Sequence, residues 1–219
     1  MKKASLLFWA ALLPLGILFG QTTAANDPAA KKILDAVSAK LKSFTSLQAT
    51  FTYKIENAAG KLLSSKPGTL TMKGTKYKLV FSDQVIICNG VAMWNIDIAS
   101  NEVVITTLDA SGDMISPQKL FSNFYDKDFL YVYKGEKKVG TKQVQEIQLT
   151  PTDKTKNFHS VYLQIDKATN TMYNTLIMEN AGNRYTCTVS SMLANPVAAD
   201  ALFVFDKSKY PGISIEDLR

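Results

Sequence analysis

The chain of 219 residues contains one histidine and two cysteines. A protein metal centre requires several His, Cys or carboxylate side chains at ligand spacing, whereas the single histidine, His159, alternates with apolar residues as a strand residue does. The sequence also has no Gly-x-Ser-x-Gly nucleophile elbow and no glycine-rich phosphate loop. We therefore predict no catalytic residues, no metal, no cofactor, and a binding protein rather than an enzyme.

Arginine is nearly as scarce, because Arg184 and Arg219 are the only two among 25 basic residues. The lysines are spread along alternating segments, which is typical of a solvated sheet face and of protected sheet edges. A nucleic-acid-binding surface would need basic residues clustered among aromatic ones, and the sequence has no such cluster. We predict no nucleic-acid partner.

The one long apolar run, Leu6–Gly20, lies near the N-terminus, between a short basic start and small residues that end at Ala25. This order is typical of a secretory signal peptide, and the run is short for a helix that spans a bilayer. We predict that residues 1–25 are a cleaved signal peptide and that residues 26–219 form one exported domain. An uncleaved membrane anchor is the alternative.

The two cysteines, Cys88 and Cys187, both lie in segments that alternate like strands. In an exported protein they can form a disulfide. They can equally be two buried thiols that behave as small apolar residues. The sequence leaves both alternatives open.

From residue 46 onward, apolar residues occupy every second position. In residues 46–56, for example, Leu47 and Phe51 fall on one face and polar residues on the other, which indicates a half-buried strand. Turn signals such as Asn89-Gly90 divide the rest into about ten or eleven strands, and short hairpin loops make consecutive strands antiparallel neighbours.

Four further signals refine this pattern. Asp27-Pro28 opens an amphipathic helix with Asp as its N-cap, and Ser116-Pro117 begins a second helix that continues through Phe124. Pro67-Gly68 predicts a break between two strands, and Leu202–Phe205 reads as a C-terminal strand. The sequence therefore predicts a mainly β (α+β) domain, in which a wide, curled antiparallel sheet is covered on its concave apolar face by two helices.

Several segments resemble a known family in their order and spacing. They are Leu41–Phe44 followed by Gln48–Thr52, the hairpin Val85–Trp94 with its Asn89-Gly90 turn, Leu149–Pro151, and Leu202–Phe205 followed by Pro211–Ile213. Over nearly all of residues 26–219 the chain is similar to the periplasmic outer-membrane lipoprotein carriers, the LolA-like proteins.

This resemblance implies an unclosed antiparallel β-barrel with a helical lid, located in the periplasm. It implies a carrier that receives the acyl chains of lipoproteins from an ATP-driven exporter in the inner membrane. The carrier delivers them to an acceptor lipoprotein or to the membrane itself at the outer membrane. The partners implied are acylated lipoproteins, this exporter and this acceptor, and the expected state is a monomer.

We predict that apolar side chains of the concave face line the acyl-chain cavity: Leu47, Phe51, Tyr53, Leu70, Met72, Leu79, Phe81, Trp94 and Ile96 from the strands, and Phe121 and Phe124 from the lid. In the family, an arginine in the turn near Met72 latches the lid. This chain has no arginine there, and Lys73 is the candidate latch.

Two other functions fit the same pattern. One is a periplasmic module of the same fold that binds another lipid or hydrophobic ligand, or acts as a chaperone. The other is an outer-membrane β-barrel, whose strands also alternate. The amphipathic helix predicted after Asp27 and the many charged residues on the polar faces of the strands argue against the second.

Overall fold

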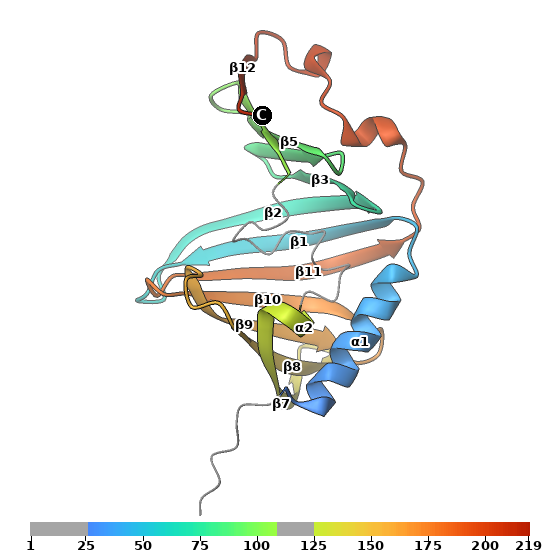
Figure 1. Ribbon diagram of the computed structural model, residues 1–219, viewed down its shortest axis with the longest axis vertical. Helices are drawn as coiled ribbons and strands as arrows, with labels where there is room; N and C mark the ends of the chain where they lie inside the picture. The colour runs from blue at the N-terminus through green and yellow to red at the C-terminus, as the bar shows by residue number, and fades with distance from the viewer. Residues whose placement is uncertain (1–25, 109–124) are drawn as a thin grey trace, which may run out of the picture.

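The computed structural model describes residues 26–108 and 125–219 of the chain, and these residues form one large sheet with two α-helices (Figure 1). The strands are β1 (Leu47–Glu56), β2 (Leu62–Lys73), β3 (Lys76–Val80), β4 (Gln84–Cys88), β5 (Ala92–Asp97), β6 (Glu102–Thr107), β7 (Phe129–Val139), β8 (Lys142–Pro151), β9 (Phe158–Asp166), β10 (Thr171–Glu179), β11 (Arg184–Ala194) and β12 (Ser214–Asp217). The helices are α1 (Pro28–Lys42) and α2 (Tyr125–Asp128), with two short 3-10 helices, η2 (Asp200–Phe203) and η3 (Lys207–Lys209). The signal peptide predicted at residues 1–25 and the helix predicted to end at Phe124 lie outside the described residues.

The strand order in the described residues is β12-β6-β5-β4-β3-β2-β1-β11-β10-β9-β8-β7. Two antiparallel meanders are joined where β1 pairs with β11, from Leu47 opposite Ala194 to Glu56 opposite Arg184. The two edge strands, β12 and β7, are not neighbours, so the sheet stays open. The prediction of an unclosed antiparallel sheet with covering helices is confirmed, and the sheet has one strand more than the upper estimate.

Helix α1 begins where the sequence predicts. The Asp27 carboxylate accepts a hydrogen bond from the backbone N–H of Ala29 at 2.8 Å, which caps the helix. Its other oxygen accepts from the backbone N–H of Tyr133 at 3.0 Å, on the outer edge of β7. These bonds hold the pKa of Asp27 below its ordinary value. One carboxylate therefore caps α1 and attaches its start to the edge of the sheet.

Residues directly opposite one another in paired strands point to the same face of a sheet. Leu47 lies opposite Met72, and Met72 opposite Tyr77. Tyr77 in turn lies opposite Cys88. These residues share one buried cluster with Leu34 and other apolar residues of α1. We call this side of the sheet the helix face; in Figure 1, α1 packs on it over the lower strands, including β7 and β10.

The opposite side of β4–β6 is covered by the C-terminal segment. Its residues Phe205, Tyr210 and Ile213 pack against a second buried cluster, and the rings of Phe205 and Tyr210 stack at 5.7 Å. The strand residues of this cluster are Val85, Ile87, Ala92, Trp94, Ile96, Val103 and Ile105. We call this side the tail face. In Figure 1 the segment, in orange and red, runs along β3–β5 and ends as β12.

The prediction of a strand at Leu202–Phe205 is wrong. Asp200–Phe203 forms a 3-10 helix instead, and the carboxylate of Asp200 is held by two lysines of β2 and β3. The last strand comes later, because Ser214–Asp217 pairs in parallel with β6. A short, fully exposed strand such as β12 has no buried alternation for a sequence pattern to detect.

The predicted break at Pro67-Gly68 is also wrong, since β2 runs through both residues. Strand β3 pairs only with Thr69–Lys73, so at Pro67 strand β2 has a free edge, where proline is tolerated. Gly68 lies beneath an aromatic ring of β1. Within the described residues, no helix is long and apolar enough to cross a membrane.

The C-terminal segment, residues 195–219, should contribute strongly to stability. Phe203 is fully buried, so we expect Phe203→Ala to lower the free energy of unfolding by about 3–5 kcal/mol. The neighbouring Val197 is fully exposed, and Val197→Ala serves as the matched control. Denaturant unfolding of both variants checks this, and equal midpoints would mean that the segment is only loosely attached.

Candidate functional site

The helix face is apolar, but its burial is uneven. Near α1 and the start of β1, residues such as Leu47, Met72 and Tyr77 are at most 4% exposed. Further along the same face the apolar side chains are only partly buried: Tyr53, Leu70, Leu79, Ile86, Ile177 and Met192. Among the described residues, the face therefore offers apolar side chains that are only partly covered, as a site for a hydrophobic ligand requires.

Seven of the predicted lining residues share this face. They are Leu47, Phe51, Tyr53, Leu70, Met72, Leu79 and Phe81, placed there by the pairing of β1, β2 and β3 and by ring contacts. Phe121 and Phe124 lie outside the described residues. That these side chains contact a ligand remains a prediction.

Trp94 and Ile96 do not belong to this set, so the prediction that they line the same surface is wrong. Cys88 on the helix face lies opposite Met93, so the next residue, Trp94, points the other way. Both Trp94 and Ile96 are buried on the tail face beneath the C-terminal segment. They are core residues of the tail face and cannot line the same surface as Leu47.

A row of aromatic rings, one buried and three partly buried, crosses the helix face. Phe51 meets Phe81 edge-to-face at 5.7 Å, and Phe81 lies 6.1 Å from Tyr53. Tyr53 stacks on Tyr185 of β11 at 6.3 Å. Gly68 makes this row fit, because a Cβ at that position would lie 2.4 Å from the Phe51 ring. Aromatic rings in such pairs add rigid apolar area to the face.

Several helix-face residues were missed by sequence reasoning. Tyr185 and Cys187 point to this face from β11, where Tyr185 lies opposite Ile55 and Cys187 opposite Tyr53. Their alternation was visible in the sequence. What was not visible is that β11, so distant along the chain, lies next to β1.

No disulfide joins the two cysteines, both of which lie in described strands. Cys88 is on β4 and Cys187 on β11, with β3, β2 and β1 between them. At about 4.8 Å per strand they lie about 19 Å apart along the sheet, too far to bond. Burial raises the pKa of the Cys187 thiol to about 11, and that of Tyr53 to about 12. Both groups are neutral at physiological pH, as suits an apolar surface.

Lys73 has partners in the C-terminal segment. Its Nζ lies 3.2 Å from a carboxylate oxygen of Asp200 and 3.3 Å from the carbonyl oxygen of Ala198. Lys76 binds the same oxygen of Asp200 at 3.2 Å, and the two lysines hold the pKa of that carboxyl below its ordinary value. The contact is exposed and contributes little to stability. A role for Lys73 as a lid latch remains a prediction.

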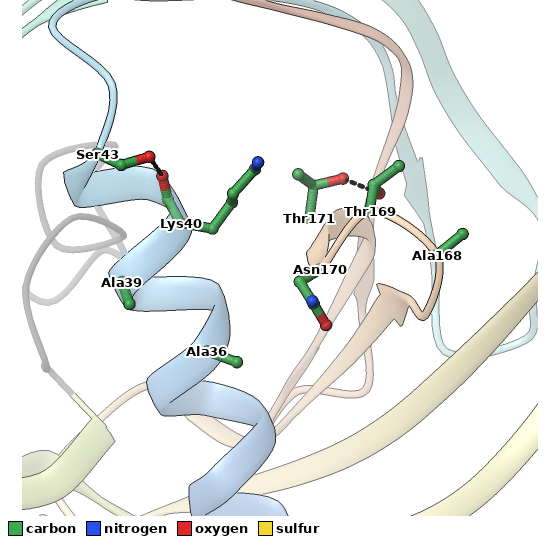
Figure 2. Close-up of a pocket in the computed structure, with 8 residues that line it drawn as sticks. All are labelled: Ala36, Ala39, Lys40, Ser43, Ala168, Thr169, Asn170 and Thr171. Atoms are coloured by element: carbon green, nitrogen blue, oxygen red, sulfur yellow. Dashed lines mark hydrogen bonds between the residues drawn. The ribbon is translucent and has the colours of Figure 1, made fainter.

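A pocket of about 680 Å³ lies between α1 and the turn that joins β9 to β10, where Figure 2 shows Lys40 reaching toward Thr171. It is lined by Ala36, Ala39, Lys40, Ser43, Ala168, Thr169, Asn170 and Thr171. These side chains are small or polar, so this pocket is unsuited to an acyl chain. Within residues 26–108 and 125–219, no three His, Cys or carboxylate side chains gather as metal ligands do.

The family model for the outer membrane lipoprotein carrier protein LolA matches residues 42–206, which is more than half of the chain. The chain belongs to this family. No curated protein matches the sequence.

Among solved structures, an uncharacterized conserved protein from Thermus thermophilus is 13% identical, with a TM-score of 0.58, covering 86% of this chain and 99% of that one. A putative outer membrane lipoprotein-sorting protein domain from Vibrio parahaemolyticus is 14% identical, with a TM-score of 0.44, covering 80% and 97%. LprF from Mycobacterium bovis is 10% identical, with a TM-score of 0.49, also covering 80% and 97%. The likeness to the Thermus protein concerns the fold alone.

The role of Gly68 can be tested directly. We expect Gly68→Val to displace the Phe51 ring and lower the free energy of unfolding by about 1–3 kcal/mol, because overpacking a filled site is destabilising. Denaturant unfolding measures the loss. Adding Phe51→Leu should recover part of it, and a double variant less stable than Gly68→Val would contradict the assigned contact.

Proposed function

We propose that this protein is a periplasmic carrier that binds the acyl chains of lipoproteins on its helix face. Family membership supports this class of cargo. The single observation that carries the proposal is the half-buried apolar surface of β1–β4, β10 and β11, with its row of aromatic rings. The protein acts by shielding a ligand and not by changing it.

The chemistry of the cargo explains why such a surface is needed. Each CH₂ group of an acyl chain exposed to water costs about 0.8 kcal/mol, so a lipoprotein cannot cross an aqueous compartment unshielded. Side chains that are already half-buried gain only part of their burial energy from a ligand. The affinity then stays low enough for the ligand to leave, which a carrier requires.

The proposal includes two transfer partners. An ATP-driven exporter in the inner membrane supplies the lipoprotein, and an acceptor at the outer membrane receives it. Family membership supports the proposal of these two partners and of a periplasmic location for the mature protein.

Native mass spectrometry tests the cargo. The mature protein is purified without detergent from a host that co-expresses a tagged lipoprotein. We expect a one-to-one complex with the acylated lipoprotein, and loss of the complex when the cargo's lipidated cysteine is replaced. Free lipid alone in the spectrum, with the lipoprotein left in the membrane, would instead support a general lipid-binding module of the same fold.

Two neighbouring residues of β3 test the binding face. Leu79 lies opposite Ile86 on the helix face, whereas Val80 lies opposite Val85 on the tail face. Both side chains are partly accessible to solvent. We expect Leu79→Glu to weaken retention of the lipoprotein by about tenfold or more, because a buried carboxylate would meet the acyl chain.

Val80→Glu is the matched control and should retain the cargo. Thermal unfolding of both variants separates binding from folding. Equal retention by the two variants, or a greater loss in Val80→Glu, would contradict binding at the helix face.

A further inference from the structure

The helix face ends in a polar rim, at the end of β1 furthest from Leu47. We define the rim as Tyr53, Lys66, Asp83, Glu179 and Tyr185. Tyr53 lies opposite Lys66 on β2, so both side chains point to the helix face. Its ring stacks on that of Tyr185. The apolar surface therefore has one end where hydroxyl and charged groups gather.

The charges of the rim are already partly matched. The ammonium group of Lys66 forms an ion pair with Asp83, and the second oxygen of Asp83, Oδ1, is buried without a hydrogen-bond partner. Glu179 accepts a hydrogen bond from the side-chain amide of Asn183 at 3.1 Å. The hydroxyl of Tyr185 also contacts Glu179, which together with burial raises the pKa of that tyrosine.

Two further charged groups at this end, Glu56 and Arg184, face away. Glu56 lies opposite Arg184, one position beyond Ile55 and Tyr185 in the pairing of β1 with β11. Because side chains alternate along a strand, Glu56 and Arg184 point to the other side of the sheet. The rim thus holds one cation, Lys66, and two carboxylates, Asp83 and Glu179. Asp97, opposite Gln84 on the same face, interacts with both Lys66 and Asp83, so the net charge at this end is negative.

We propose that this rim holds the carbonyl end of the ligand and selects neutral acyl esters and amides over free fatty acids. The inference rests on the proposed function, since it assumes that acyl chains lie on the helix face. The chains run from the rim toward Met72 and Cys88, where the face is most deeply buried. An ester or amide carbonyl accepts a hydrogen bond from the Tyr53 hydroxyl without bringing a charge, whereas the single hydrogen of the Tyr185 hydroxyl is directed at Glu179.

A fatty-acid carboxylate would instead meet Glu179, with the cation of the rim already paired to Asp83. Like charges held a few ångströms apart near a protein surface repel strongly enough to weaken binding about tenfold. The rim therefore excludes free fatty acids by charge, while the apolar part of the face accepts their chains.

Displacement of a bound fluorescent acyl probe from the mature protein at neutral pH tests this. Monolauroylglycerol and laurate carry the same chain and differ in charge, and a soluble diacylglyceryl-cysteine peptide reports on lipoprotein cargo. We expect monolauroylglycerol to bind about tenfold more tightly than laurate. We expect Glu179→Gln to remove most of this preference by improving laurate binding. Glu56→Gln, at the same end but on the other face, should leave the preference unchanged.

The outcomes distinguish an error in the rim assignment from an error in the proposed function. Equal affinities for monolauroylglycerol and laurate, or a preference that survives Glu179→Gln, overturn the rim assignment and leave the binding face intact. Failure of every acyl compound to bind overturns the proposed function and the rim with it. Tight binding of the peptide as well as the glycerol ester identifies the lipoprotein as a source of the selected carbonyls, and binding of the glycerol ester alone identifies a glycerolipid.

Discussion

The structure depends on one mismatch of size: its sheet is far wider than the helix that packs on it. Twelve strands at about 4.8 Å spacing extend about 53 Å along the sheet, whereas an α-helix is about 10 Å wide. With 15 residues, α1 is about 22 Å long and packs on strands such as β7 and β10. Over β1–β4 and β11, several apolar side chains of the same face, such as Leu70, Leu79 and Met192, stay half-buried. In the part of the chain that the structure describes, these partly covered side chains form the surface on which we propose that the ligand lies.

The two faces of the sheet differ in how completely their apolar side chains are covered. On the tail face, the C-terminal segment covers Trp94 and Ile96, which are at most 9% exposed. The segment is held to the sheet by the pairing of β12 with β6. That packing is part of the fold. On the helix face, Leu70 and Leu79 are left partly accessible beside a row of aromatic rings. Changes on the tail face should therefore affect stability, and changes on the helix face should affect what the protein holds.

Much of the fold could be predicted from the sequence, because strong local signals decide it. The alternation of β1, the Asp27 cap and the Asn89-Gly90 turn each act within a few residues. Which residues of distant strands lie on the same face of the sheet could not be predicted. The run Val85–Cys88 is apolar on both sides, so its pattern does not say which side continues the face of Leu47, and Trp94 was placed wrongly. The same limit hid Tyr185 and the polar rim, which depend on β11 pairing with β1.

Photo-crosslinking can decide whether acyl chains lie on the helix face. A lipopeptide with a diazirine in its acyl chain is bound to the mature protein, irradiated and mapped by mass spectrometry of the peptides. We expect labels on helix-face residues of β1, β3 and β11, such as Phe51, Leu79 and Cys187. Labels confined to the tail face around Trp94, or to the polar pocket beside Lys40, would contradict it.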